Sequence, residues 1–245
     1  MPLSLEFGEA ELIWQYFLQH PRVGTMIDVG AQFGTSFREY LRAGWRVVAF
    51  EPDPAKLPKL QKYMNDPRFT LYTQGVGDVA RSDVPFFTSD ESTGISSLIP
   101  FRASHQETTR INIVTLSSVL ADLDLAALDY LKVDTEGNDY RVIRGFPWDR
   151  LKPEVVLCEF DEVKTRGLGF DYRTLGDVLV AQGYAVWMSE WYPLERYGSG
   201  HRWRRIASCP ALIADPNSWG NFIAVRSDAG VPAMNALVAM HGSGA

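Results

Sequence analysis

The chain has 245 residues, of which 46% are hydrophobic and 22% charged, and carries a formal net charge of -6 at pH 7. This composition is typical of a globular protein with a sizeable core, and the acidic balance disfavours nonspecific binding to nucleic acids or anionic membranes. Two cysteines are too few for a disulfide framework, and they show no metal-binding spacing. No signal peptide or membrane-spanning apolar run is present, so we expect a cytoplasmic protein without an integral membrane segment.

Strand and helix patterns alternate along most of the chain, after an amphipathic helix expected at residues 9–20. The predicted strands are short apolar runs and cover residues 25–29, 46–50, 69–75, 128–133, 154–159, 184–189 and 222–226. The predicted helices that follow or separate them cover residues 35–43, 55–65, 116–123, 139–144 and 172–182. Residues 79–112 are irregular and polar, with strand-like pieces at 84–88 and 111–114.

This order predicts parallel βαβ units with helices covering both faces of the sheet. We expect an α/β fold with a doubly wound, mostly parallel seven-stranded sheet, whose last strand is antiparallel because no helical pattern precedes it. No linker interrupts the chain, so residues 1–245 are expected to form a single domain. Its peripheral parts are a helical segment at 1–24, an aromatic and arginine-rich insertion at 189–220, and a C-terminal tail at 228–245.

The first strand runs into a tight turn in the sequence MIDVGAQFGTSF, residues 26–37. Ligands of doubly wound sheets bind at the carboxyl ends of the strands, so this turn is the expected cofactor site. Glu51 ends the next strand about 20 residues later, the spacing at which an acidic side chain grips ribose hydroxyls. Cofactor contacts are therefore predicted for residues at these two strand ends, namely Asp28, Gly30, Ala31, Gln32, Gly34, Thr35, Glu51 and Pro52.

Gln32 occupies the position of the second glycine in a dinucleotide fingerprint, where a side chain hinders the close approach of a pyrophosphate. S-adenosylmethionine has no phosphate and presents an ammonium, a carboxylate and a cationic sulfonium, which suit acidic and carbonyl surroundings. The turn therefore favours S-adenosylmethionine over NAD. Gly77 and Asp78 follow the third predicted strand, where Asp78 is a candidate partner of the adenine amino group and an ordinary Gly-Asp turn is the alternative.

A second informative segment is LDYLKVDTEGNDYRVIRGF, residues 128–146, in which a strand delivers Asp134 and Glu136 at its carboxyl end. Here the sequence resembles the FkbM-like methyltransferases, S-adenosylmethionine-dependent enzymes of the class I, Rossmann-like fold. The resemblance rests on four pieces in the family's order and spacing: IDVGAQFGTSF, VVAFEPDP, TLSSVLADLDLAALDYLKVDTEGNDYRVIRGF and EVVLCEFDE. The family commonly has asparagine where this chain has Gln32, a mild departure. The resemblance implies methyl transfer, commonly O-methylation of a hydroxyl in a sugar or natural product, and leaves the acceptor open.

Methyl transfer to a hydroxyl benefits from a base that takes the proton of the acceptor. The first candidates are Asp134, which is also a predicted cofactor contact, and Glu136; capping of the following helix is an alternative role for Asp134. Glu159 and Asp161, after the fifth strand, are the second candidates. His201 is a further candidate base, because the pKa of histidine lies near neutrality. A divalent cation bound by the same carboxylates is a less favoured alternative that we do not predict.

The segment SEWYPLERYGSGHRWRRIASCP, residues 189–210, concentrates aromatic residues and arginines. In a class I methyltransferase we expect it near the acceptor pocket, where aromatic faces suit a sugar ring and arginines suit a phosphate or carboxylate. Packing of a long loop onto the core, or stacking on RNA bases, are alternative roles. The serine-rich segment STGISSL, residues 92–98, is predicted to form another wall of the pocket.

The leading hypothesis is an S-adenosylmethionine-dependent O-methyltransferase acting on a carbohydrate, glycoconjugate or other small-molecule acceptor. An NAD-dependent oxidoreductase is disfavoured by Gln32 and by the lack of a hydride-transfer set such as Tyr-x-x-x-Lys. A nucleic-acid partner is not expected, because neither a basic face nor an N/D-P-P-Y motif is present. A non-catalytic Rossmann-like binding protein would be expected to lose the carboxylates beside the cofactor, which this chain keeps.

Overall fold

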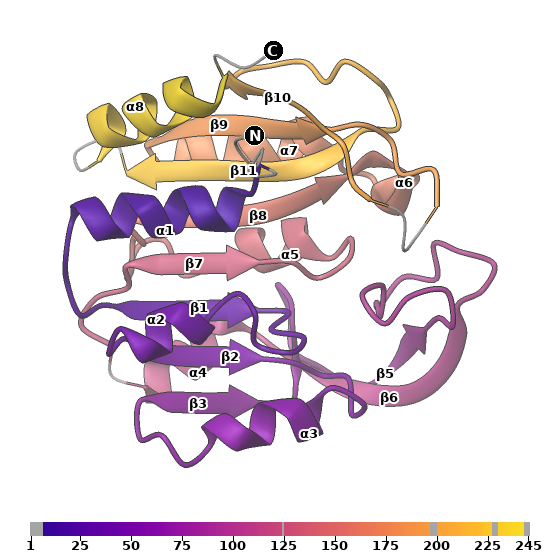
Figure 1. Cartoon of the computed structure of the whole chain (residues 1–245). Helices are drawn as coiled ribbons and strands as arrows, with labels where there is room; N and C mark the ends of the chain where they lie inside the picture. The colour runs from indigo at the N-terminus through magenta and orange to yellow at the C-terminus, as the bar shows by residue number, and fades with distance from the viewer. Residues whose placement is uncertain (1–6, 124, 197–199, 227–229, 243–245) are drawn as a thin grey trace.

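The computed structural model describes residues 7–123, 125–196, 200–226 and 230–242 (Figure 1). Its main sheet has eight strands in the order β10-β9-β11-β8-β7-β1-β2-β3. These strands are β1 Thr25–Val29, β2 Arg46–Phe50, β3 Phe69–Tyr72, β7 Tyr130–Val133, β8 Val155–Asp161, β9 Tyr184–Trp191, β10 Trp203–Ser208 and β11 Trp219–Arg226. Strands β3, β2, β1, β7 and β8 pair in parallel, whereas β11 is antiparallel to β8 and β9, and β10 is antiparallel to β9.

Helices cover both faces of the main sheet (Figure 1). One face carries α1 Glu9–Gln19, α2 Arg38–Arg42, α3 Leu57–Leu60 with the 3-10 turn η1 Gln61–Tyr63, and α8 Val231–Gly242. The other face carries α4 Leu116–Asp122, α5 Asp139–Arg144 and α7 Tyr172–Ala181, and the short helix α6 Glu162–Thr165 follows β8 directly. Within the described ranges, no helix combines the length and apolar character needed to cross a lipid bilayer.

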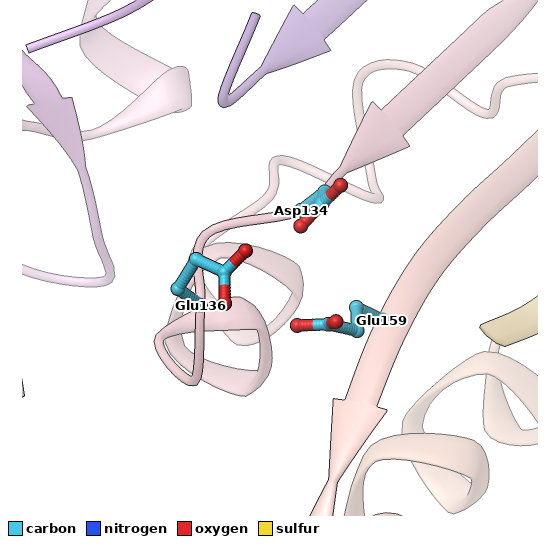
Figure 2. A group of neighbouring side chains, drawn as sticks. All are labelled: Asp134, Glu136 and Glu159. Atoms are coloured by element: carbon cyan, nitrogen blue, oxygen red, sulfur yellow. The ribbon is translucent and has the colours of Figure 1, made fainter. Parts of the chain in front are cut away.

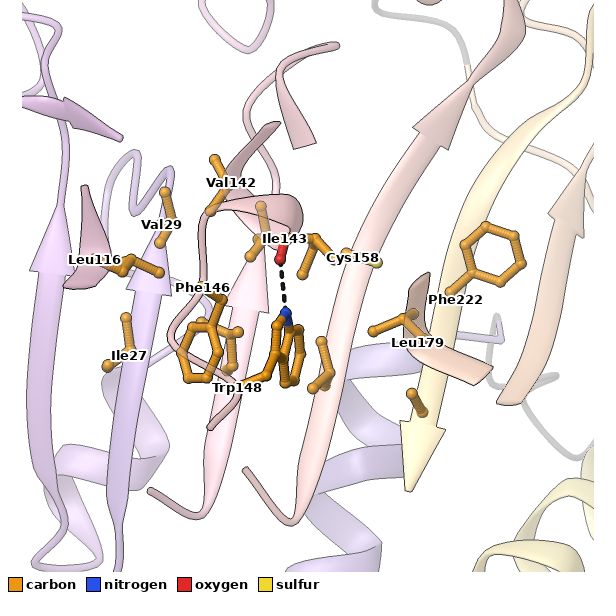
Figure 3. Packing of buried hydrophobic residues seen from close by; sticks show 14 of the residues in the cluster. Ile27, Val29, Leu116, Val142, Ile143, Phe146, Trp148, Cys158, Leu179 and Phe222 are labelled. Carbon is orange, nitrogen blue, oxygen red and sulfur yellow. Dashed lines mark hydrogen bonds between the residues drawn. The ribbon is translucent and has the colours of Figure 1, made fainter. Parts of the chain in front are cut away.

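Each central strand contributes to two hydrophobic cores, because successive side chains of a strand point to opposite faces. In β1, Ile27 and Val29 pack under α4 and α5, whereas Met26 packs on the side of α1 and α2. Figure 3 shows the first of these cores, in which Trp148 Nε1 donates a hydrogen bond to the carbonyl oxygen of Ile143 over 2.9 Å. Burial on both faces explains why the central strands are continuous apolar runs in the sequence.

The predicted fold class is confirmed, and the main sheet contains one strand more than the seven predicted. The additional strand, β10, lies in the region predicted as an insertion. Its residues are only partly buried, so it has no apolar run that would mark it as a strand in the sequence. Helix α8 falls in the predicted C-terminal tail, where the absence of charged residues removes the usual amphipathic pattern. Residues 1–6, 197–199, 228–229 and 243–245 of the predicted peripheral segments lie outside the described residues.

Several predicted boundaries differ from those observed. Helix α2 begins at Arg38, three residues later than predicted, because the chain turns through residues 35–37 after Gly34, which has φ +81. The helix predicted at 55–65 is reduced to α3 and η1. The strand predicted at 69–75 is divided, because β3 ends at Tyr72 and the following residues pair with a second sheet.

This second sheet is built mainly from the region predicted as irregular. Its three strands, in the order β4-β6-β5, are β4 Gly75–Val76, β5 Arg81–Thr88 and β6 Gln106–Val114. Only Phe86, Ile111 and Ile113 form its buried cluster, which explains the weak strand signal in the sequence. The sheet lies beyond the carboxyl ends of the parallel strands, where it can wall a ligand site (Figure 1).

Candidate active site

A cavity of about 510 Å³ lies at the edge of the main sheet where the parallel strands end. Consecutive neighbours in the sheet supply its lining, with Glu51 after β2, Gly30 after β1, Asp134 after β7 and Glu159 on β8. Apolar residues of the second sheet close one side, namely Val76, Phe86 and Ile111. Both the volume and the position at the carboxyl edge are those of a ligand pocket in a doubly wound fold.

The turn after β1 forms the floor of the cavity and has no room for a side chain at Gly30. Gly30 has φ +85, and a Cβ built on it would overlap the carbonyl oxygen of Asp134. The N–H groups of Gly30 and Ala31 both donate to the carbonyl oxygen of Phe50 at 3.0 Å. The ends of β1, β2 and β7 are therefore held together by backbone contacts that only glycine permits at this position.

Glu51 closes the same turn from the side of β2. Its Oε2 accepts a hydrogen bond from the N–H of Gln32 at 2.7 Å, and its Oε1 accepts one from the N–H of Asp53 at 2.9 Å. Burial raises the pKa of Glu51, while Lys56 and the two N–H groups oppose this rise. Gln32 has φ 49, and its N–H is directed at the carboxylate of Glu51.

Asp28 and Lys132 form a buried ion pair beneath this turn. Lys132 Nζ lies 3.2 Å from Asp28 Oδ1 and 3.5 Å from Asp134 Oδ2, and it donates to the carbonyl oxygen of Gly30 at 3.0 Å. The hydroxyl of Ser36 also donates to Asp28. Burial lowers the pKa of Lys132, but Asp28 and Asp134 more than offset this effect and raise it. Asp28 therefore acts as an internal counter-ion that anchors the floor of the cavity.

Three carboxylates of the cavity lining lie close together. Asp134, Glu136 and Glu159 point toward one another (Figure 2), with one oxygen from each lying within 4.8 Å of the others. Lys164 of α6 lies among them, with its Nζ 2.6 Å from Glu136 Oε2 and 2.9 and 3.0 Å from the two oxygens of Glu159. The side chain of Asp134 is 41% exposed, so Asp134 is the most open of the three carboxylates.

Burial changes the proton affinity of Glu136 and Glu159. It raises the pKa of Glu136 to about 7, with Asp134 adding to the rise and Lys164 opposing it. Burial likewise holds the pKa of Glu159 well above its usual range, against the opposing effect of Lys164. The cluster can therefore take up or release a proton near neutral pH, which is the property required of a general base.

Glu136 lies on a turn held by buried polar groups. Glu136 and Gly137 have φ 57 and φ 101, and this left-handed conformation is uncommon for glutamate. The carboxylate of Asp139 accepts hydrogen bonds from the N–H groups of Thr135 and Gly137 at 3.1 and 3.2 Å. The hydroxyl of Ser97 donates to the carbonyl oxygen of Glu136 at 2.7 Å. Backbone strain that is held by so many contacts is typical of functional sites.

A family model described as the methyltransferase FkbM domain matches residues 28–186 of the chain. The chain belongs to the FkbM methyltransferase family. The matched segment contains the turn after β1, Glu51 and all three carboxylates of the cavity. The NAD-dependent oxidoreductase alternative is thereby set aside in favour of an S-adenosylmethionine-dependent methyltransferase. A comparison of this FkbM-family protein with curated proteins gave no match.

Several solved structures are similar to this FkbM-family methyltransferase. One is precorrin-6Y C5,15-methyltransferase from Geobacter metallireducens GS-15, with 14% identity, coverage of 88% of this chain and 86% of that chain, and a TM-score of 0.45. Another is the C-terminal domain of the Rhodobacter capsulatus enzyme of the same name, with 17% identity, coverage of 91% and 92%, and a TM-score of 0.44. A third is magnesium protoporphyrin IX methyltransferase from Synechocystis PCC 6803 with bound SAH, with 11% identity, coverage of 89% and 81%, and a TM-score of 0.44.

Buried polar atoms of the methyltransferase suit an adenosyl cofactor. Gln74 Oε1, Thr135 Oγ1 and Asn138 Oδ1 line the cavity and have no hydrogen-bond partner among the described residues. Such atoms accept hydrogen bonds from amino and hydroxyl groups, which S-adenosylmethionine presents. Together with Glu51 and the turn at Gly30, they form a set of groups that fits this cofactor.

Most of the predicted cofactor residues line the cavity: Gly30, Ala31, Gln32, Thr35, Glu51, Pro52 and Asp134. Asp28 lies beneath the floor of the cavity, and three further predicted cofactor residues, Gly34, Gly77 and Asp78, do not line it. Gly34 packs against Phe37, and Gly77 packs against Gly145. Asp78 forms an ion pair with Arg144, so it is engaged away from the cavity. Its position after a predicted strand was the only sequence signal for a role in binding.

The predicted catalytic residues that line the cavity are Asp134, Glu136, Glu159 and His201. The second-rank candidate Asp161 does not line it; its Oδ1 caps α6 by accepting hydrogen bonds from the N–H groups of Val163 and Lys164. Sequence reasoning missed the lysines of the site, which are Lys56, Lys132 and Lys164. Lys132 lies within the K-x-D-x-E-G motif, which was a usable signal, whereas no motif marked Lys164.

The predicted wall at residues 92–98 does reach the cavity, through Gly94, Ser96 and Leu98. The hydroxyl of Ser96 donates to Asp53 Oδ2 at 2.7 Å, on the side of β2. The hydroxyl of its neighbour Ser97 contacts the turn after β7. The segment thus contacts the residues that follow β2 and those that follow β7.

Methyl transfer is expected to be insensitive to chelators, because Lys164 supplies the positive charge that a divalent cation would bring to the three carboxylates. Replacement of Lys164 with methionine removes this charge, so the variant should gain affinity for Mn²⁺. The measurement is the melting temperature of the parent and of Lys164→Met with and without Mn²⁺, which should rise only in the variant. Lys164→Arg is the control that keeps the charge. Loss of parent activity with EDTA, restored by Mg²⁺, would contradict this prediction.

Proposed function

We propose that this methyltransferase O-methylates a hydroxyl group on a carbohydrate, a glycoconjugate or another small natural product. The observation that carries the proposal is the cluster of Asp134, Glu136 and Glu159 in the same cavity as the cofactor-type turn at Gly30. S-adenosylmethionine would be held by that turn, by Glu51 and by Gln74, and supplies the methyl group as an electrophile. A neutral hydroxyl becomes a better nucleophile when a nearby carboxylate takes its proton.

Glu136 is the proposed base. Burial raises its pKa to about 7, so at neutral pH it is partly ionised and has substantial affinity for a proton. Both oxygens of Glu159 accept hydrogen bonds from Lys164, whereas Glu136 pairs with this lysine through Oε2, which leaves Oε1 for the acceptor hydroxyl. Asp134 is more exposed and contacts Lys132, so its proposed role is to orient the acceptor hydroxyl.

His201 is the alternative base. It lines the cavity from the segment before β10 and is exposed, and its ring lies edge-on to Trp219 at a centroid distance of 5.0 Å. This ring contact suits packing against an acceptor better than proton transfer within the carboxylate cluster. We therefore place His201 in the wall of the acceptor site rather than in the proton-transfer step.

The proposed function is tested by a screen with methyl-labelled S-adenosylmethionine over sugars, glycolipids and small phenols. A methyl ether is expected, identified by a product whose label resists mild alkaline hydrolysis, which would release a methyl ester. Binding of S-adenosylhomocysteine, measured by calorimetry, separates the two parts of the proposal. Transfer to nitrogen or carbon, or an alkali-labile product, would contradict O-methylation of a hydroxyl. Absence of S-adenosylhomocysteine binding would contradict the cofactor.

A further inference from the structure

The cavity continues beyond the carboxylates to residues outside the matched family segment. Its far end is lined by Ala10 of α1, His201 and Trp219 of β11. Trp219 pairs with Asp161 in the sheet register, so it lies at the same edge as the ends of the parallel strands. Three strand spacings separate β1 from β11, or roughly 14 Å. This end of the cavity therefore lies well away from the turn at Gly30.

Stacked aromatic rings form the wall at this end. Trp219 stacks on Trp191 with a centroid distance of 5.4 Å and an interplanar angle of 23°. His201 lies edge-on to both rings, at 5.0 Å from Trp219 and 6.2 Å from Trp191. Trp219 Nε1 donates to the carbonyl oxygen of Tyr192 at 3.1 Å, which fixes the ring orientation. Together these rings offer an apolar surface with a defined orientation.

A buried carboxylate from the N-terminal helix holds this wall in place. Glu9 Oε1 accepts hydrogen bonds from Trp191 Nε1 at 2.7 Å and from the hydroxyl of Ser189 at 2.6 Å. Ser189 in turn accepts a hydrogen bond from Trp203 Nε1 at 3.0 Å. Glu9 precedes Ala10 directly, so the same turn of α1 both orients the rings and lines the cavity.

The arginines of this region are engaged elsewhere. Arg202 and Arg204 lie over the ring of Tyr192, at 3.7 and 4.2 Å from its centroid. Arg204 and Arg205 also form ion pairs with the buried carboxylate of Glu190, at 3.4 and 2.8 Å. Among the described residues, none of these arginines lines the cavity. The carboxylate closest to the aromatic wall is that of Glu9, which accepts a hydrogen bond from Trp191 Nε1. This end of the cavity therefore offers no guanidinium group to a negatively charged acceptor, which would lose its hydration without gaining an ion pair.

The geometry points to an acceptor subsite, formed by Ala10, His201 and Trp219, that binds an uncharged hydroxylated ring and rejects anionic acceptors. This inference rests on the proposed function, and it replaces the expectation that arginines of the segment recognise a phosphate or carboxylate. Glu9 is a positioning residue of the subsite, because it acts through Trp191. Residues outside the family match thus select the acceptor, whereas the matched segment holds the cofactor and the base.

Calorimetry with matched probes in the presence of S-adenosylhomocysteine tests the subsite. Phenyl β-D-glucopyranoside is expected to bind at least about tenfold more tightly than phenyl β-D-glucuronide, which differs by one carboxylate. Trp219→Ala should weaken binding of the glucopyranoside at least about fivefold. Ala10→Trp should block binding of the glucopyranoside, because Ala10 lines the cavity and a tryptophan side chain there would fill part of it. Leu18→Trp, at an exposed position of the same helix, is the matched control. None of these variants should change the affinity for S-adenosylhomocysteine.

The role of Glu9 is tested with two substitutions. Glu9→Ala removes the acceptor of both hydrogen bonds, whereas Glu9→Gln keeps a side-chain oxygen. Glu9→Ala should weaken glucopyranoside binding with unchanged S-adenosylhomocysteine affinity, and Glu9→Gln should restore it. The inference is overturned if the glucopyranoside does not bind, if the glucuronide binds as tightly, or if Ala10→Trp binds the probe like Leu18→Trp. In each case the affinity for S-adenosylhomocysteine shows separately whether the cofactor part of the proposed function holds.

Discussion

Replacement of Glu136 with glutamine is expected to slow methyl transfer by about 10²–10⁴-fold while leaving the affinity for S-adenosylhomocysteine nearly unchanged. Glutamine keeps the size of the side chain and an oxygen that can accept a hydrogen bond from Lys164, but it cannot take the proton of an acceptor hydroxyl. The measurement is single-turnover transfer together with calorimetric titration of S-adenosylhomocysteine. Asp177→Asn, on the exposed side of α7, is the control for a carboxylate-to-amide change outside the cavity.

The pH dependence of transfer provides a second test of Glu136. Because burial raises its pKa to about 7, the side chain becomes protonated as the pH falls through this value, and a protonated carboxyl group cannot act as the base. Transfer by the parent protein should therefore decrease below about pH 7, and the Glu136→Gln variant should lack this decrease. A variant with the parent's rate and pH profile would assign the base to another residue, and His201→Asn would then be the next substitution to measure.

Replacement of Glu51 with alanine is expected to weaken S-adenosylhomocysteine binding by at least about 10²-fold, since hydrogen bonds to a charged group contribute roughly 1.5–3 kcal/mol each. Glu51 lines the cavity at the end of β2, where its carboxylate can accept hydrogen bonds from ribose hydroxyls. The variant also leaves the N–H groups of Gln32 and Asp53 without their acceptor, so the turn itself should loosen. Calorimetry of the folded variant, checked by circular dichroism, measures the effect.

Glu51→Gln separates the two contributions of this residue. The amide oxygen can still accept one of the two backbone hydrogen bonds, so the melting temperature should stay closer to that of the parent than it does for Glu51→Ala. Cofactor affinity should nevertheless fall, because the amide carries no charge. If both variants bind S-adenosylhomocysteine as the parent does, Glu51 only stabilises the turn and the cofactor site lies elsewhere in the cavity.

The sequence alone predicted those residues of the cavity that directly follow a strand in the chain. Gly30 and Glu51 follow successive buried strands, and Asp134 follows a third, so the parallel arrangement of these strands brings their ends to one edge. The interpretation of Gln32 also came from its place in the local sequence, and in the structure its N–H donates a hydrogen bond to Glu51. These positions are predictable because the apolar run of each strand shows where the strand ends, and the next residues then lie at the carboxyl edge of the sheet.

Other parts of the site were decided only by the tertiary structure, because they depend on contacts between distant segments. Lys164 forms ion pairs with Glu136 and Glu159, but no sequence motif marked the helix that carries it. The arginines near residue 204 looked available for an acceptor in the sequence, yet Glu190 and Tyr192 engage them in the fold. Composition shows which charges a segment carries, whereas only packing decides which of them remain available to a ligand. The sequence thus determined the fold class and the strand ends that line the cavity, and the tertiary structure determined which charged groups of the later segments face it.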